Sequence, residues 1–170
     1  NQVVTLADIT AGKLKYTPPA NAFGSGYAQV GFTVSDGSAS STASTITFNV
    51  TDTNDAPTAI AWATGGSVAE NSSAGTVVGT LSATDPNTGD VLRFRRTTNA
   101  NFTVDPDGTV KVASNAVIDF EEATTQTLGI EVSDSGGLTY TQNLTVTLSD
   151  VTATDPAVFA TPLYVALGST

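Results

Sequence analysis

The sequence predicts an all-β chain made of tandem β-sandwich modules, the first of them truncated. Three observations predict this: an internal repeat, strands that alternate apolar and polar residues, and turn-forming residues between the strands. In the repeat, Gly31-Phe32-Thr33-Val34-Ser35-Asp36 returns as Gly129-Ile130-Glu131-Val132-Ser133-Asp134, an offset of 98 residues. A sandwich module typically takes about 100 residues. The 170 residues therefore hold one complete module and parts of others.

Two strands are predicted in the first module, at residues 29–34 and 44–50. In the first of them Val30, Phe32 and Val34 fall on one face, and residues 46, 48 and 50 repeat this pattern. Strict alternation indicates a strand with one buried face. Threonine and serine occupy the outward positions, and β-branched threonine suits a pleated, half-exposed surface.

The complete module contains about seven predicted strands, the number expected of an immunoglobulin-like sandwich. They lie at residues 59–63, 77–83, 92–97, 102–104, 109–112, 128–133 and 142–148. Turn signals separate them, such as Asp105-Pro106-Asp107-Gly108, in which the acids are expected to shape the turn. No segment has a convincing helical period with a cap. Trp62 is expected to be a core or inter-module residue.

Composition excludes several classes of function. The net charge of −10 and the pI of about 4.1 argue against a nucleic-acid partner. The chain has no Cys and no His, so it offers no disulfide, no zinc–thiolate site and no thiol or His-assisted nucleophile. No apolar run is long enough to cross a membrane, and the N-terminus lacks the pattern of a signal peptide. We therefore expect a non-catalytic segment excised from a longer protein, with no membrane insertion.

Five short motifs follow one another through the complete module. They are Ala69-Glu70-Asn71, Asp85-Pro86-Asn87, Phe102-Thr103-Val104-Asp105, Ile118-Asp119-Phe120-Glu121 and Val132-Ser133-Asp134-Ser135-Gly136. In this order they resemble the motifs of a cadherin repeat. The preceding linker, Asp52-Thr53-Asn54-Asp55-Ala56-Pro57, is similar to the linker that joins cadherin modules.

Two other segments resemble the family less closely. The second linker, Asp150-Val151-Thr152-Ala153-Thr154-Asp155-Pro156, has a small insertion and lacks the central Asn-Asp pair. Residues 14–32 resemble the cadherin-like repeats of large bacterial surface adhesins. In this first module, Asn21 and Phe23 stand where the second has Asp119 and Glu121, so those acids are missing.

The resemblance implies three segments and calcium at the joints between modules. Residues 1–55 would be the C-terminal part of a cadherin-like module, 56–150 a complete module, and 151–170 a linker with the first strand of a following module. Calcium accepts 6–8 oxygen ligands. The family's arrangement would place Ca²⁺ at one joint with Asp52, Asn54, Asp55, Asp85, Asn87 and Asp134, and at the other with Glu70, Asp119, Glu121, Asp150 and Asp155. Solvated linker charge is the alternative at both joints, and Asp36 is either a turn residue or a ligand.

The expected function is calcium-rigidified adhesion or spacing, in an extracellular or cell-surface protein of bacterial origin. The expected partners are neighbouring modules, and another adhesin or a surface glycan. A carbohydrate-binding module of a polysaccharide-active protein is the alternative, although most aromatic residues fall in predicted strands.

The truncated first module leads to one further expectation. It lacks counterparts of residues 58–98, so apolar faces and strand edges would be exposed. Residues 157–167, from the same or a neighbouring chain, could pair with this module and give a strand-exchanged dimer. The alternative is that a longer parent protein supplies the missing strands.

Overall fold

The computed structural model describes residues 2–151, and the chain divides into two compact units. The first unit contains the residues up to Asp55 together with Pro86–Gly89. The second contains Ala56–Asp85 and continues from Asp90. Residues 157–167, for which strand exchange was hypothesised, lie outside the described residues.

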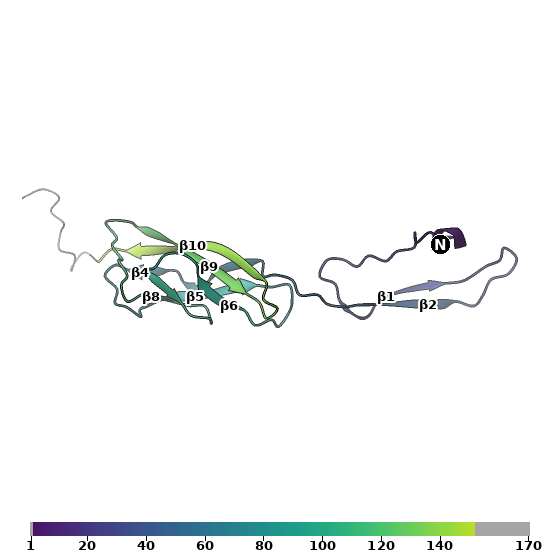
Figure 1. The fold of residues 1–170 in the computed structure, drawn as a ribbon, viewed down its shortest axis with the longest axis horizontal. Coiled ribbons are helices and arrows are strands. Elements are labelled where there is room, and N and C mark those ends of the chain that lie inside the picture. The colour runs from purple at the N-terminus through teal and green to yellow at the C-terminus, as the bar shows by residue number, and fades with distance from the viewer. Residues whose placement is uncertain (1, 152–170) are drawn as a thin grey trace, which may run out of the picture. The chain divides into compact units, whose positions relative to one another are not determined.

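The second unit is a sandwich of two four-stranded sheets (Figure 1). One sheet has the order β4 (Ser67–Ala69), β10 (Thr139–Ser149), β9 (Thr125–Ser133) and β6 (Arg93–Arg96). The other has the order β3 (Ala59–Gly65), β5 (Val77–Thr84), β8 (Thr109–Val112) and β7 (Phe102–Val104). Neighbouring strands are antiparallel, except that β4 runs parallel to β10. The predicted all-β sandwich is confirmed.

The core lies between these two sheets and follows the alternation of the strands. Along β9, Leu128, Ile130 and Val132 are all fully buried, and Val146 and Leu148 repeat this on β10. The opposite sheet contributes buried residues that include Phe102, Val110 and Val112. Burying one such side chain contributes about 1.5–3 kcal/mol. Trp62 packs against this core, and its indole Nε1 donates a hydrogen bond to the carbonyl of Thr145 at 3.1 Å.

Seven of the eight strands in this unit were predicted. Two of them, β7 and β8, have the predicted bounds, whereas β9 and β10 begin three residues earlier than predicted. The missed strand is β4, Ser67–Ala69. With three residues it is too short to display an alternating pattern, and it forms by pairing with residues 147–149 of β10.

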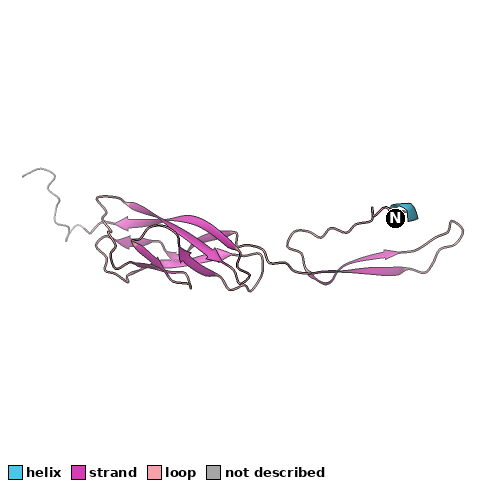
Figure 2. Cartoon of the chain, in the orientation of Figure 1, coloured by secondary structure: helices cyan, strands magenta, loops and turns pink. Residues whose placement is uncertain are grey.

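The first unit consists of an antiparallel hairpin and a short helix (Figure 2). The hairpin strands are β1 (Gly24–Phe32) and β2 (Ser44–Val50). The helix α1 (Leu6–Thr10) was not predicted. It is stabilised locally: the Thr5 hydroxyl accepts a hydrogen bond from the Asp8 amide at 3.2 Å, and the Asp8 carboxylate pairs with Lys13 at 2.8 Å. Five residues are too few to reveal a helical period.

Apolar residues of the first unit remain in contact with solvent. None of residues 2–55 is buried, and Val30, Phe32 and Ile46 are 47%, 40% and 41% exposed. One aromatic contact links the hairpin to the segment before it: Tyr16 stacks on Phe48, with 4.6 Å between the ring centroids. Within the described residues, no helix has the length and apolar character needed to span a membrane.

Candidate metal centres

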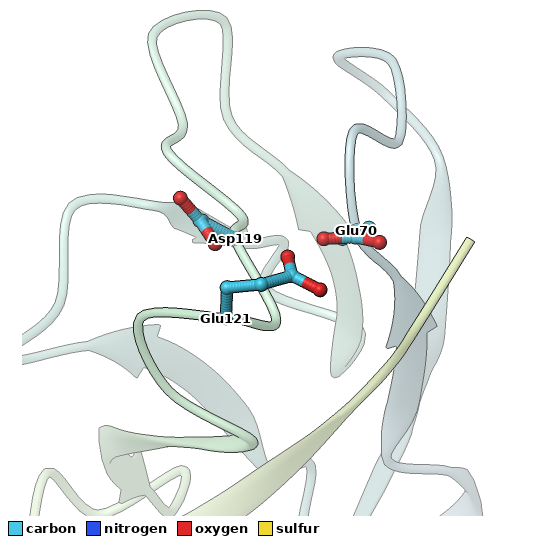
Figure 3. A group of neighbouring side chains, drawn as sticks. All are labelled: Glu70, Asp119 and Glu121. Atoms are coloured by element: carbon cyan, nitrogen blue, oxygen red, sulfur yellow. The ribbon is translucent and has the colours of Figure 1, made fainter. Parts of the chain in front are cut away.

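One acidic cluster lies at the end of the second unit where β10 finishes. It consists of Glu70, Asp119 and Glu121, whose carboxylate oxygens lie within 4.8 Å of one another. Glu70 directly follows β4, whereas Asp119 and Glu121 come from the segment between β8 and β9. Figure 3 shows the carboxylates of Glu70 and Glu121 turned toward one another, with Asp119 beside them. The two segments are far apart in sequence and meet only through the fold.

Backbone hydrogen bonds hold Glu70 in place. Its Oε1 accepts from the Val151 amide at 2.7 Å, and its Oε2 accepts from the Phe120 amide at 3.0 Å. These bonds, that of Val151 first, lower the pKa of Glu70, and smaller contributions from Glu121 and Asp150 act in the same direction. Burial opposes them, because the residue is only 3% exposed. Glu70 is therefore a buried carboxylate at neutral pH, and Asp150 belongs to its surroundings.

The backbone around the cluster is tied to the core of the sandwich. The Glu70 amide donates to the carbonyl of Ser149 at 3.0 Å, and the Asn71 amide donates to that of Ile118, also at 3.0 Å. Ile118 is 5% exposed and anchors the segment that carries Asp119. The Asp119 carboxylate accepts a hydrogen bond from the Glu122 amide at 3.0 Å, which orients it at the start of a turn. The cluster is thus preorganised by its own backbone.

A second acidic cluster consists of Asp85, Asp90 and Asp134, again with carboxylate oxygens within 4.8 Å of one another. Asp85 directly follows β5 and Asp134 directly follows β9. Asp134 is 6% exposed, and its Oδ1 accepts from the Leu138 amide at 2.8 Å within the β9–β10 turn. Because β9 and β10 are antiparallel, this cluster lies at the opposite end of the sandwich from Glu70.

Asp90 was missed as a candidate ligand, because the segment Asn87-Thr88-Gly89-Asp90 has the composition of a turn. Its Oδ1 accepts a hydrogen bond from the Ser135 hydroxyl at 2.7 Å. Its Oδ2 is buried and has no hydrogen-bond partner among the described residues. Burying a charged oxygen without a partner is unfavourable. A cation beside Asp90 would remove that cost.

Three residues of the first linker meet Asn87 within the first unit. The Asn87 side-chain amide donates to the Asp52 carboxylate at 3.3 Å and to the Thr53 carbonyl at 3.0 Å. The Asn87 side-chain oxygen accepts from the Asp55 amide at 2.7 Å. These hydrogen bonds bring Asp52, Asp55 and Asn87 together. Asn54 lies in the same linker, and Asp155 lies outside the described residues.

The turn acids predicted outside these clusters do have structural roles. Asp107 accepts a hydrogen bond from the Thr109 amide at 2.9 Å, and this bond lowers the pKa of Asp107. Asp105 pairs with Lys111. In the first unit, Asp36 accepts from the amides of Ser38 and Ala39, both at 2.8 Å. The predicted turn role of Asp107 agrees with its contact, and the Asp105 carbonyl accepts a hydrogen bond from the Gly108 amide at 2.9 Å within the same turn. Asp36 also shapes a turn.

The donor atoms in both clusters fit a hard cation. All are carboxylate oxygens, and the chain contains no His or Cys. Calcium takes 6–8 oxygen ligands in flexible geometry, whereas magnesium requires a nearly ideal octahedron. Side chains contributed by several loops suit the more tolerant ion. The chemistry of the residues present therefore fits calcium.

Comparison with known proteins identifies the family. The family model of the cadherin domain matches residues 65–149, half of the chain. The chain belongs to the cadherin family. Cadherin domains are typically extracellular, adhesion-related and calcium-binding, and they are generally not catalytic.

A curated relative and two solved structures agree with this assignment. The cadherin-related protein hmr-1 of Caenorhabditis elegans is 34% identical over 137 residues, which are 78% of this chain and 5% of the relative. EC1-4 of PcdhgB3 superposes with a TM-score of 0.54 at 20% identity, covering 73% of this chain and 32% of that one. EC3-6 of protocadherin gammaB7, solved as a cis-dimer, gives 0.50 at 26% identity, covering 71% and 32%. This chain thus corresponds to a small part of a long relative.

Proposed function

We propose that this chain is a non-catalytic, calcium-binding segment of a cell-surface or secreted adhesin, in which calcium stiffens the joints between cadherin modules. One observation carries the proposal: acidic clusters lie at both ends of the complete sandwich. The cluster of Asp85, Asp90 and Asp134 lies at the end where the chain enters β3 from the linker, because Ala59 pairs with Thr84. The cluster of Glu70, Asp119 and Glu121 lies where the chain leaves β10. Acids at both ends suit ions that join a module to each neighbour.

The proposed ligands at each joint follow from the clusters. At the first joint we propose Asp85, Asp90 and Asp134 with Asn87 and the linker residues Asp52, Asn54 and Asp55. At the second joint we propose Glu70, Asp119 and Glu121 with Asp150 and Asp155. Only Asp90 is added to the set that the sequence predicted. The hydrogen bonds of Asn87 to the linker support its place in the first set.

Electrostatics explains why such a joint would respond to calcium. Two carboxylates 4 Å apart repel by about 1 kcal/mol in water and by more where water is excluded. Each cluster contains three acids within 4.8 Å, so several such terms act at once. A bound divalent cation changes repulsion into attraction. Without it, the loops that carry the acids are expected to separate.

Thermal unfolding in chelator, followed by a calcium titration, tests the proposal. At about 100-fold excess over Kd, a ligand specific to the folded state adds about 2.7 kcal/mol, and we expect a clear rise in melting temperature. Substituting Asp134→Asn or Glu121→Gln should reduce that rise. Asp107→Asn is the matched control, because Asp107 forms a turn away from both clusters. If millimolar calcium leaves the melting temperature unchanged, the acids do not bind calcium and are solvated linker charges. That result would overturn the proposal.

The setting and the partners are part of the same proposal. We propose neighbouring modules of the parent protein as the first partners, and a second adhesin or a surface glycan as the adhesive contact. A bacterial source is supported by residues 14–32, which resemble repeats of bacterial adhesins, whereas the curated relative is a nematode protein. A glycan array with the intact chain separates adhesion through sugars from adhesion through protein.

A further inference from the structure

The segment between β8 and β9 carries Asp119 and Glu121 and contains neither helix nor strand. Side chains bind its backbone at Val117, two residues before Asp119. The Val117 amide donates a hydrogen bond to Oδ1 of Asn101 at 3.0 Å, and the Val117 carbonyl accepts one from Nδ2 of Asn101 at 2.9 Å. Both backbone groups of Val117 therefore bind the same amide side chain.

Asn101 is itself held firmly. It directly precedes Phe102, the fully buried first residue of β7. Its Nδ2 also donates to Oε1 of Gln126 on β9 at 3.0 Å, and that oxygen accepts a second hydrogen bond from Asn99 at 3.1 Å. Gln126 in turn donates to the Val117 carbonyl at 3.2 Å. We call Asn99, Asn101 and Gln126 the amide triad.

The amide triad acts on the residues that lead into the acidic cluster. Val117 is 62% exposed, so apolar packing does not fix it, whereas the next residue, Ile118, is 5% exposed. Beyond Asp119, the Phe120 amide donates to Glu70 at 3.0 Å. Asp119 is thus bracketed by two hydrogen-bonded positions, and it lies beside Glu70 (Figure 3). On the side of Val117, the hydrogen bonds come from the triad.

We propose that Asn101 is a positioning residue of the second joint: by binding both backbone groups of Val117, it holds Asp119 beside Glu70 before any ion is present. Residues that orient metal ligands typically change metal affinity by about 10- to 100-fold when they are replaced. The proposal rests on the proposed function for the identity of the ion. The positioning itself is a property of the metal-free fold.

Hydrogen exchange of the intact chain in chelator, measured by NMR, tests the positioning. The Phe120 amide, bonded to Glu70, reports on one acidic cluster, and the Leu138 amide, bonded to Asp134, reports on the other. We expect Asn101→Ala to speed exchange at Phe120 at least about 10-fold relative to Leu138, because the segment would open locally.

A calcium titration followed at the same two amides gives a Kd for each joint. Asn101→Ala should weaken binding at the second joint about 10-fold and leave the first joint unchanged. Gly79→Ala is the control for lost stability, because its Cβ would collide with the backbone of β3 and Gly79 has no part in the amide triad. It should change neither Kd nor the ratio of the two exchange rates.

In a wild-type chain that binds calcium, the absence of either effect in Asn101→Ala overturns the proposal, and so do equal effects in Gly79→Ala. If Asn101→Ala does not fold, Gln126→Ala decides. It removes one hydrogen bond to the Val117 carbonyl and should give a smaller shift at the second joint alone. If the wild type shows no calcium shifts, the proposed function fails, and the exchange at Phe120 still tests the positioning.

Discussion

At the residue scale, Asp90 offers the clearest test of carboxylate repulsion against metal binding. Its Oδ1 is held by Ser135, while its Oδ2 is buried without a hydrogen-bond partner among the described residues. The carboxylates of Asp85 and Asp134 lie within 4.8 Å. The charge of Asp90 is therefore expected to lower the stability of the fold without a cation and to raise it when a cation is bound.

We predict that Asp90→Asn raises the melting temperature in chelator and lowers it in saturating calcium. In chelator the substitution removes carboxylate repulsion, about 1 kcal/mol for each pair at 4 Å in water. In calcium it removes a ligand. Differential scanning calorimetry of both states measures the two shifts. A loss of stability under both conditions would show that Asp90 acts only through its hydrogen bond to Ser135.

Gly79 has a structural role of a different kind. It pairs with Gly65, just beyond the register shift of β3 and β5 between Trp62 and Thr64. A Cβ at Gly79 would lie 2.3 Å from the carbonyl oxygen of Thr64 and 2.9 Å from the amide nitrogen of Gly66. Both are backbone atoms, so no side chain can rotate to make room.

We predict that Gly79→Ala lowers the free energy of unfolding by about 1–3 kcal/mol, the usual cost of overpacking a well-packed site. Urea denaturation of the second unit measures it. Gly31→Ala is the control, because its Cβ would have no neighbour closer than 4.0 Å. Equal stability of Gly79→Ala and the wild type would contradict this prediction. It would mean that β3 and β5 can move apart to admit the methyl group without a loss of free energy.

At the element scale, the two equivalent hairpins differ in what surrounds them. Ile130 on β9 is fully buried between two sheets, whereas Phe32, its counterpart on β1, is 40% exposed. The sequence alone predicted the strands of both hairpins and their apolar faces, because alternation is a local property. The first strand was predicted at residues 29–34, whereas β1 spans Gly24–Phe32. It could not reveal β4, whose three residues become a strand only by pairing with β10.

We predict that Ile130→Ala destabilises the chain by about 2–5 kcal/mol, because it leaves a cavity in a packed core. Phe32→Ala should change the stability of the chain by less than about 0.5 kcal/mol, as surface substitutions usually do. Chemical denaturation of both variants measures the contrast. A large effect of Phe32→Ala would indicate that the apolar face of the β1–β2 hairpin is covered in solution.

At the scale of the whole molecule, the main feature is an excess of acidic over basic residues. The chain carries 16 acidic and 6 basic residues, and among the described residues three ion pairs involve Lys or Arg. Salt screens exposed charges over about 10 Å at 0.1 M and about 3 Å at 1 M. The carboxylate oxygens of each cluster lie within 4.8 Å of one another, and most of these residues are at least partly buried, so salt screens their charges less.

We predict that millimolar calcium raises the melting temperature more than sodium chloride of equal ionic strength, and more than equimolar magnesium. Screening acts on all acids alike, whereas coordination requires a site of suitable geometry. Melts in the three salts measure the difference. Equal shifts for calcium and magnesium would point to a general divalent-cation effect on the acidic surface.

The all-β class, the repeat, most strands and most of the acids in both clusters could be predicted from the amino-acid sequence. They follow from local alternation and from short motifs at fixed spacing. The folded chain was needed to show that Asp119 lies beside Glu70, that Asp90 joins Asp85 and Asp134, and that the apolar face of the β1–β2 hairpin is exposed. The physical reason is that carboxylates become neighbours, and apolar faces become core, only when distant strands pair and two sheets pack.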